Sequence, residues 1–314
     1  MPTDVETDAP TGALGRVQQA IGGREVVERL ASLSGSDFAT LMLDVARRRA
    51  GAETPATVLR RYRSDRFVRP GGVPWQLLRR AEDLLAANLP AECELLTLAP
   101  LVPLGTHSAL GPVSQDKIVT AMRACETAAD PTNALALEAA VRRTAQRNAP
   151  VRLAAFQRVV RAQQIAQAGN FAHFSLLGLA TAGRDDGGHR FEREAIAEHV
   201  AAIAAGLGAV PFGAIQLALT PLTPTGEGIA TAVRSLLAAA AVQVDVVLDT
   251  TREAGRGYYR ELCFKINVWA GGEWAEVGDG GFTDWVARLM ASSKERLLIS
   301  GIGIDRVAML SPES

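Results

Sequence analysis

The chain has 314 residues, of which 48% are hydrophobic and 21% charged, and its formal net charge at pH 7 is −1. This length can bury a large core without disulfides or metal. The near-zero charge excludes nucleic-acid binding driven by overall charge, so any RNA contact would need a local basic patch. The three cysteines, Cys93, Cys125 and Cys263, lack CxxC spacing and have apolar neighbours. They predict reduced thiols in a cytosolic protein and no zinc site.

The first residues, MPTDVETDAPTG, are polar and acidic. We therefore expect residues 1–12 to form a disordered tail and not a signal peptide. No apolar run approaches the roughly 20 residues that a membrane-spanning helix needs. The sequence predicts a cytoplasmic protein without a membrane partner.

Residues 13–72 predict a helical extension. Ser36 is the expected N-cap of one helix, and Thr54 followed by Pro55 is a start signal for another. The arginine clusters at 47–49 and 60–63 would suit RNA phosphates, but a solvated basic face is the commoner meaning of such clusters.

Residues 73–314 are expected to form the main domain. Pro74 opens a helix whose expected inward side chains include Trp75 and Leu85, and a strand over 94–99 then meets Pro100. Residues 103–117 are expected to form a loop, and its histidine, His107, has no assigned role.

The middle of the chain predicts alternating strands and helices. Asp130 and Thr132 are placed to cap a helix. Strands are expected over 151–161 and 174–182. A helix over 191–208, a strand over 214–219, a helix over 228–240 and a strand over 242–248 complete this part.

The C-terminal part carries the strongest local pattern. Residues 258–269 alternate as a strand, and Gly278, Gly280 and Gly281 predict a turn, followed by a helix over 283–290. A strand over 297–299 then runs through two glycines into a short helix with Asp305 and Arg306. Glycines at such a junction let a ligand approach the backbone, and an arginine there suits phosphate.

The order of these pieces resembles the catalytic core of class II aminoacyl-tRNA synthetases, with the histidyl branch as the nearest match. The long helix and strand ending at Pro100 resemble motif 1, and the strand pair around Arg161 resembles motif 2. Gly257-Tyr258-Tyr259 resembles a paired-tyrosine strand, Gly280 to Asp284 a GGRYD segment, and Gly303 to Arg306 motif 3.

This resemblance implies an α+β fold, with an antiparallel β-sheet flanked by helices and an N-terminal helical extension. It also implies ATP and Mg²⁺ as cofactors. Arg161 would bind the α-phosphate and Arg306 the γ-phosphate as the catalytic pair, and Phe174 would stack on adenine. Gln163 replaces an acidic residue that contacts the adenine side.

The resemblance further implies an amino-acid-like substrate and a homodimer. Asp130 and Thr132 would hold the substrate's α-ammonium group, and Tyr258 and Tyr259 would also contact the substrate. Glu261 and Asp284 are candidate carboxylates near the metal.

Several positions depart from the histidyl pattern. Leu176 and Ala180 stand where a Gln and a Glu read the imidazole, so histidine is not the expected substrate and a smaller or more apolar amino acid is favoured. The arginine before the paired tyrosines falls on Ala254, which leaves Arg252 or Arg256 as substitutes, and the Arg and Tyr of GGRYD are Phe282 and Thr283. The sequence closes at Ser314, so an anticodon-binding domain is expected to be missing.

Three interpretations stay open at this point. The first is an adenylate-forming ligase that activates an amino acid and passes it to a tRNA, a carrier protein or a small molecule. The second is a silent regulatory subunit that resembles the histidyl-synthetase-like partner of ATP phosphoribosyltransferase. The third is a plain α/β protein whose motifs occur by chance.

Overall fold

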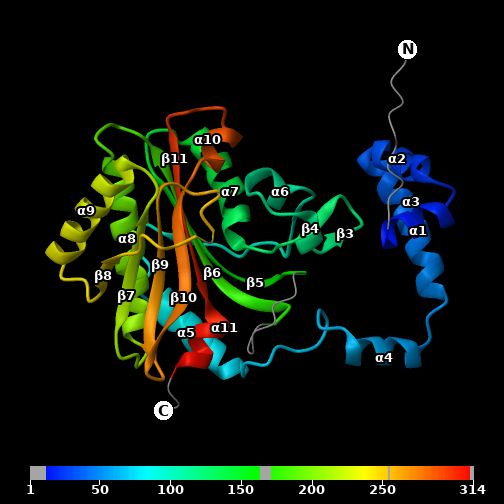
Figure 1. Cartoon of the computed structure of the whole chain (residues 1–314), viewed down its shortest axis with the longest axis horizontal. Helices are drawn as coiled ribbons and strands as arrows, with labels where there is room; N and C mark the ends of the chain where they lie inside the picture. The colour runs from blue at the N-terminus through cyan, green and yellow to red at the C-terminus, as the bar shows by residue number, and fades with distance from the viewer. Residues whose placement is uncertain (1–11, 163–170, 254, 312–314) are drawn as a thin grey trace. The chain divides into compact units, whose positions relative to one another are not determined.

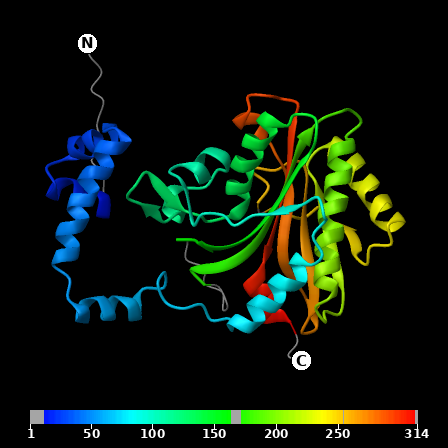
Figure 2. The ribbon, with the colours of Figure 1, turned by 180° about the vertical axis from the view of Figure 1, so that it is seen from behind.

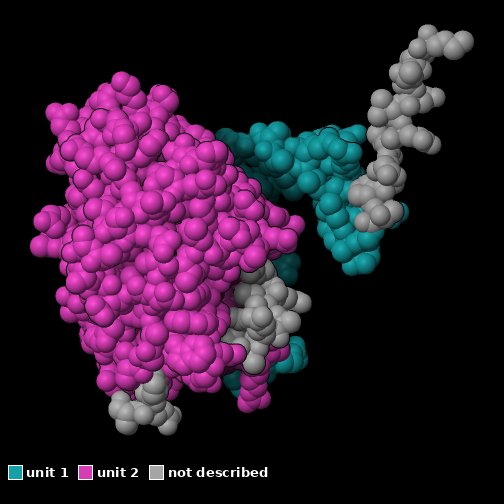
Figure 3. Space-filling view, turned by 60° about the vertical axis from the view of Figure 1, so that its left-hand side comes forward, with its two compact units in different colours: residues 1–61, 121–125 teal, residues 62–120, 126–314 magenta. Residues whose placement is uncertain are grey.

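The computed structural model describes residues 12–162, 171–253 and 255–311, and its ribbon is drawn from two sides in Figures 1 and 2. The chain divides into two compact units, one formed by residues 1–61 and 121–125 and the other by residues 62–120 and 126–314. Figure 3 colours these units teal and magenta.

The first unit is helical. It contains α1 (Ala13–Ala20), α2 (Arg24–Ser32) and α3 (Gly35–Gly51), and α4 (Pro55–Ser64) begins in it. The N-cap of α3 is Ser34 and not the predicted Ser36, because the Ser34 Oγ accepts a hydrogen bond from the Asp37 N–H at 3.1 Å. Thr54 caps α4 as predicted, since its Oγ1 accepts from the Thr57 N–H at 3.2 Å.

The second unit is built on an eight-stranded sheet with the order β1-β5-β6-β11-β10-β9-β7-β8. Its strands are β1 (Glu94–Leu95), β5 (Val151–Val160), β6 (His173–Arg184), β7 (Ile215–Pro221), β8 (Asp245–Leu248), β9 (Arg260–Ala270), β10 (Glu273–Thr283) and β11 (Glu295–Gly303). The predicted α+β class is confirmed.

The sheet is mainly antiparallel, as expected, and has one parallel pair at each edge. All pairs from β5 to β7 are antiparallel, but β1 pairs with β5 and β8 with β7 in parallel. Each parallel edge strand is reached by a connection that contains a helix, as parallel pairing requires.

Helices cover both faces of this sheet. One face packs against α5 (Trp75–Ala86), α8 (Arg190–Gly208), α9 (Pro224–Ala239) and α11 (Ile304–Leu310), where Leu177, Ile203 and Phe264 are buried. Figures 1 and 2 show α8 and α9 side by side over these strands. The predicted inward Trp75 is instead 68% exposed, because it is the first residue of α5 and the buried side of the helix begins later, with Ala81 and Leu85.

The other face packs against α7 (Pro131–Ala145) and α10 (Trp285–Leu289), with Leu135, Leu153 and Val286 fully buried. Residues 103–117 were expected to be a loop but contain α6 (Thr106–Leu110) and the 3₁₀ turn η1 (Gln115–Lys117). A small second sheet joins β2 (Leu101–Pro103), β3 (Thr120–Ala121) and β4 (Cys125–Thr127) in the order β2-β4-β3.

The glycines that predicted a turn lie inside strand β10, so that prediction is wrong. The turn between β9 and β10 is formed by Gly271 and Gly272, with φ of 61° and 88°. A Cβ at Gly278 would lie 2.4 Å from the carbonyl oxygen of Gly301, and one at Gly281 would lie 2.6 Å from the Tyr259 ring. These strand glycines are therefore needed for close packing and not for chain reversal.

Two elements are longer than predicted. Helix α9 begins at Pro224 and not at Gly228, because the Thr223 Oγ1 accepts from the Gly226 N–H at 3.1 Å and caps the earlier start. Strand β11 extends from Glu295 to Gly303, since it pairs along its whole length with β6.

Two buried polar contacts fix the helices to the sheet. His199 on α8 lies within 2.8 Å of the Thr181 Oγ1 and of the Ser300 Oγ. Burial lowers the pKa of His199 to about 3, so this side chain is a neutral link at pH 7. Arg143 on α7 forms a two-point ion pair with Glu295, at 2.9 and 3.1 Å, and both side chains are nearly inaccessible.

The Arg143–Glu295 pair generates a stability prediction. Glu295→Ala would leave the Arg143 cation buried without its carboxylate, which should reduce the free energy of unfolding by about 3–5 kcal/mol. Urea unfolding followed by circular dichroism measures this change. Glu94→Ala is the control, because it breaks the solvent-exposed ion pair to the neighbouring Arg142 and should have a much smaller effect. Equal effects of the two substitutions would contradict the prediction.

Candidate functional site

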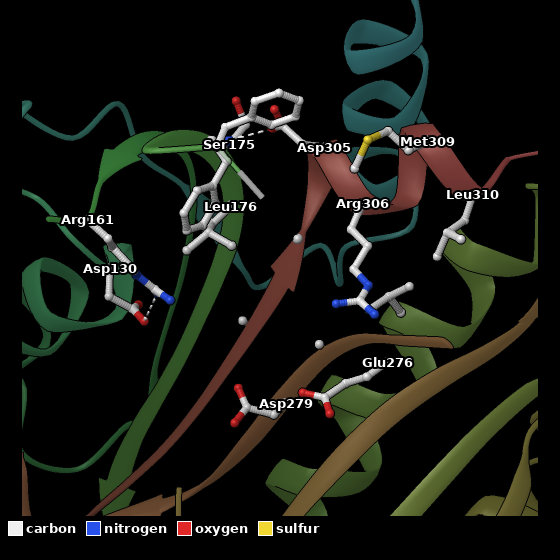
Figure 4. A pocket seen from close by; sticks show the side chains of 16 residues that line it. Asp130, Arg161, Ser175, Leu176, Glu276, Asp279, Asp305, Arg306, Met309 and Leu310 are labelled. Carbon is white, nitrogen blue, oxygen red and sulfur yellow. Dashed lines mark hydrogen bonds and ion pairs between the residues drawn. The ribbon is translucent and has the colours of Figure 1, made fainter. Parts of the chain in front are cut away.

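A cavity of about 420 Å³ opens on the sheet face that carries α7. Its floor is formed by strands β6, β10 and β11, and α11 closes one side (Figure 4). Its lining residues are Asp130, Arg161, Phe171, Phe174, Ser175, Leu176, Glu276, Val277, Gly278, Asp279, Gly301, Gly303, Asp305, Arg306, Met309 and Leu310. The strands that form the floor are thus antiparallel, and the walls of the cavity carry charges of both signs.

Arg161 enters the cavity directly after strand β5. Its Nε donates to the Ala129 carbonyl at 2.9 Å, and its Nη2 lies 3.4 Å from the Asp130 carboxylate. The guanidinium also lies 5.1 Å from the centre of the Phe174 ring. Backbone, carboxylate and aromatic ring together fix the direction of this cation.

Asp130 is the N-cap of helix α7. Its Oδ1 accepts from the Thr132 N–H at 2.9 Å and from the Thr132 hydroxyl at 2.7 Å, while Oδ2 faces Arg161. The N-terminus of a helix favours a negative charge. Asp130 therefore has a fixed direction at the cavity wall, where the buried Thr132 donates two hydrogen bonds to it.

Arg306 approaches the cavity from α11, opposite Arg161 (Figure 4). It makes no hydrogen bond or ion pair with the part of the chain that the structure describes. Its neighbour Asp305 is 4% exposed and accepts a 2.6 Å hydrogen bond from the Ser175 N–H. The second Asp305 oxygen is buried without a hydrogen bond, 3.8 Å from an Arg158 nitrogen.

Two carboxylates, Glu276 and Asp279, lie on the floor below Arg306 (Figure 4). Asp279 accepts from the Arg252 guanidinium at 3.0 Å and from the Tyr259 hydroxyl at 3.3 Å. Burial raises the pKa of Asp279, although the Arg252 charge opposes the shift. The pKa of the Tyr259 hydroxyl is also raised by burial, which keeps it a hydrogen-bond donor to Asp279.

A second cavity of about 220 Å³ adjoins the first, since Asp130 and Arg161 line both. Its other lining residues are His107, Gly111, Pro112, Val113, Lys117, Ile118, Ala129, Asn133, Tyr258 and Trp285. The Tyr258 and Trp285 rings stack with centroids 5.9 Å apart. The predicted substrate residue Tyr258 thus lines this second cavity, whereas Tyr259 is buried behind it.

The structure brings together most of the predicted site residues. Arg161, Phe174, Asp130 and Arg306 line one cavity, and Leu176 lines it too. Ala180 is fully buried in the core beneath α7. Gln163 and Ala254 lie outside the described residues.

Other candidate residues lie elsewhere. Asp284 forms ion pairs with Arg260 and Arg288, and Glu261 hydrogen-bonds with Thr223. None of these carboxylates and partners lines either cavity. Arg252 is buried against Asp279 and the Phe264 carbonyl, and Arg256 contacts the Arg252 carbonyl at 3.4 Å.

Several cavity residues were not predicted from the sequence. Glu276 and Asp279 were overlooked because the neighbouring glycines were interpreted as a turn. The sequence did contain a signal for them, because acidic residues within a strand are unusual unless they are paired. His107 was left without a role, and the structure shows it 1% exposed in the wall of the second cavity.

The first cavity offers open space, aromatic surface and a cation. A Cβ at Gly301 would meet no atom within 4 Å, so the missing side chain keeps cavity space open at no cost to packing. Phe171 and Phe174 offer aromatic surface, and Arg306 offers an uncompensated cation. Among the described residues, no three His, Cys, Asp or Glu side chains gather in a metal-binding cluster. Mg²⁺ would therefore need phosphate oxygens beside one or two carboxylates such as Glu276 and Asp279.

At the level of sequence, neither a family model nor a curated protein matches this chain. Solved structures do match. An ATP phosphoribosyltransferase regulatory subunit/histidyl-tRNA synthetase from Bacillus halodurans is 14% identical, with a TM-score of 0.64 over 78% of this chain and 83% of that one. A histidyl-tRNA synthetase from S. aureus is 12% identical, with a TM-score of 0.56 over 75% of this chain and 65% of that one.

The chain has the fold of a class II aminoacyl-tRNA synthetase catalytic core. The RNA binding domain of threonyl-tRNA synthetase from Cryptosporidium parvum matches as well, at 12% identity, with a TM-score of 0.57 over 75% of this chain and 63% of that one. At these identities the likeness concerns the fold. The synthetase-like fold therefore confirms the predicted architecture, and the chemistry has to be argued from the cavity.

The Asp130 geometry generates a prediction that separates its capping role from its charge. Asp130→Ala should lower the free energy of unfolding by about 1 kcal/mol, because the first turn of α7 loses its acceptor. Asp130→Asn should change it little, since an amide oxygen can accept from the Thr132 N–H in the same way. Chemical denaturation of both variants measures the difference. A loss in Asp130→Asn as large as that in Asp130→Ala would contradict the capping role.

No helix in the described ranges is both long and apolar enough to cross a membrane.

Proposed function

We propose that this synthetase-like chain binds ATP and an amino acid in the two adjoining cavities and forms an aminoacyl adenylate. The observation that carries the proposal is that Arg161 and Arg306, 145 positions apart in the numbering, line opposite sides of one cavity. Two cations facing each other across an antiparallel floor suit a polyphosphate.

In the proposed reaction, a substrate carboxylate oxygen attacks the α-phosphorus, and the bond from that phosphorus to the bridging oxygen of the β-phosphate breaks. Pyrophosphate leaves and takes the electron pair. Arg161 would bind the α-phosphate and Arg306 the γ end, so that the reactants are held in line. Mg²⁺, when bound, would neutralise phosphate charge. Phe174, already close to Arg161, would stack on adenine.

The amino acid would bind at the boundary of the two cavities. Its α-ammonium group would pair with Asp130, which Thr132 holds in place and whose second oxygen lies 3.4 Å from the Arg161 Nη2. Tyr258 would contact the substrate from the second cavity. The activated acyl group would pass to a tRNA, a carrier protein or a small molecule. This assigns residues 73–314 to a catalytic core and residues 13–72 to an extension, in a cytoplasmic protein.

Amino-acid-dependent exchange of pyrophosphate into ATP tests this proposal. Arg306→Ala should reduce the exchange rate by about 100- to 1,000-fold, because it removes one cation that stabilises the transferring phosphates. Arg234→Ala is the control, since Arg234 lies on α9 and lines neither of these cavities. Absence of exchange with all twenty amino acids in the unaltered protein would contradict adenylate formation.

A regulatory subunit is the second candidate function. The matched protein from Bacillus halodurans carries a regulatory-subunit name, and this chain covers 83% of its length. Leu176 and Ala180 also leave the floor and core without the polar groups that the histidyl pattern requires. Co-purification with an ATP phosphoribosyltransferase, together with absent pyrophosphate exchange, would favour this candidate over the ligase.

We also propose that the second unit forms a homodimer through α5, β1 and β2. These elements expose apolar side chains, with Trp75 68%, Leu95 48% and Leu101 42% exposed. Strand β1 is also an edge of the large sheet, and edge strands carry unpaired backbone groups.

The combined substitution Leu95→Glu and Leu101→Glu should convert this dimer to a monomer, because it places like charges in an apolar contact. Sedimentation velocity at a fixed protein concentration measures the change in mass. Leu236→Glu on α9, where Leu236 is 40% exposed, should leave the mass unchanged. A monomeric unaltered protein would refute the dimer.

A further inference from the structure

We propose that the second cavity receives the side chain of the amino acid and that this side chain carries a carboxylate. The orientation of the ligand rests on the proposed function. The chemical class rests on the lining of the second cavity itself, which includes hydrogen-bond donors and a cation.

The orientation follows from the two residues that the cavities share. An α-ammonium at Asp130 and an α-carboxylate directed to the first cavity place the remaining substituent of the α-carbon toward the second. Leu176 lines the first cavity and offers no polar group there, and Ala180 is buried in the core. The polar groups that could select a side chain therefore lie in the second cavity.

His107 fixes the direction of Asn133 in this cavity. The His107 Nε2 lies 3.1 Å from the Ala129 backbone nitrogen and 3.2 Å from the Thr127 carbonyl oxygen. Because the Ala129 N–H can only donate, we assign Nε2 as its acceptor and place the ring proton on Nδ1, which lies 2.8 Å from the Asn133 Oδ1. Because that oxygen accepts from the ring, the Asn133 Nδ2 is left as a donor. It has no hydrogen bond to any part of the chain that the structure describes.

Glu126 keeps this arrangement rigid. It is fully buried, and its carboxylate accepts from the backbone N–H groups of Gly105 and His107 and from the Gln115 amide. Burial acts to raise the pKa of Glu126, but these hydrogen bonds outweigh it and the pKa is lowered. The carboxylate is thus occupied by α6 and η1, and Glu126 does not line the cavity.

Trp285 supplies a second donor. Its side chain lines the cavity and is 3% exposed, and its indole Nε1 is buried without a hydrogen-bond partner. A Trp N–H can only donate. Buried donors of this kind are normally paired, and Trp285 lines the cavity, so we assign an acceptor on the ligand to this N–H.

Lys117 decides between a neutral and an anionic acceptor. Its side chain is exposed at the cavity lining, and it forms no ion pair with another described residue. The lining contains one carboxylate, Asp130, which Arg161 already compensates. The cavity therefore has a surplus positive charge. A carboxamide would satisfy the two donors, but a carboxylate satisfies the donors and the Lys117 charge together.

This proposal differs from the expectation of a smaller or more apolar substrate. An apolar side chain would leave the donors of Asn133 and Trp285 unpaired, and a cationic one would face Lys117. L-Aspartate and L-glutamate are the candidate substrates of this class.

Calorimetric titration of the full chain with L-aspartate, L-glutamate, L-glutamine, L-leucine and L-lysine tests the inference without requiring turnover. An acidic amino acid should bind most tightly. Lys117→Gln should weaken its binding about tenfold and leave L-glutamine binding unchanged. Asn133→Asp keeps the acceptor for His107 but replaces the donor with a negative charge, so it should abolish binding of the acidic amino acids.

Lys294→Gln is the matched control, because Lys294 is an exposed lysine outside both cavities. The inference is overturned if L-leucine or L-lysine binds more tightly than the acidic amino acids, or if neither acid binds. It is also overturned if the acids bind Lys117→Gln and the unaltered protein with equal affinity. Thermal unfolding of each variant checks that it is folded.

Pyrophosphate exchange with the same five amino acids separates this inference from the proposed function. Exchange with L-leucine but not with either acid overturns the inference and leaves adenylate formation standing. Binding of an acid that Lys117→Gln weakens, without exchange, supports the inference and counts against adenylate formation.

Discussion

The hydrogen bond from the Ser175 N–H to the Asp305 carboxylate determines where Arg306, the second cation of the first cavity, lies. It joins the first turn of α11 to strand β6 at 2.6 Å, in a place that is almost inaccessible to water. A helix as short as α11 has little stability alone, so it depends on this bond and on the burial of Ile304 and Val307. Arg306 follows Asp305 directly, and its direction into the cavity is set by its neighbour.

The parts that the sequence predicted well depend on local pattern. Strand alternation, helix caps and the order of the motifs placed Arg161 after β5 and Arg306 on α11, and the fold confirms these positions. The roles of the two arginines in catalysis stay predictions. Local pattern failed where the contact that requires a residue type is made with a residue far away in the chain. Gly281 is a glycine because of the Tyr259 ring and Gly278 because of the Gly301 carbonyl, and neither contact is visible in a nearby window.

The polar lining of the cavities was missed for the same reason. The partner of His107 is Asn133, 26 residues later, and the partner of Asp279 is Arg252, 27 residues earlier. Composition indicated a loop around His107, whereas the structure has a short buried helix there. The same fold occurs in proteins named as a synthetase and as a regulatory subunit, so the function of this chain depends on these side chains.

The contact between Asp130 and Arg161 has a consequence for how the site fills. In the resting chain each neutralises the other at 3.4 Å, on the boundary of both cavities. An amine that bound alone would pair with Asp130 and leave Arg161 without a counter-ion. A phosphate that bound alone would pair with Arg161 and leave Asp130 without one. Only the joint arrival of both gives every charge a new counterpart. Binding of one reactant should therefore raise the affinity for the other, so the two should bind cooperatively.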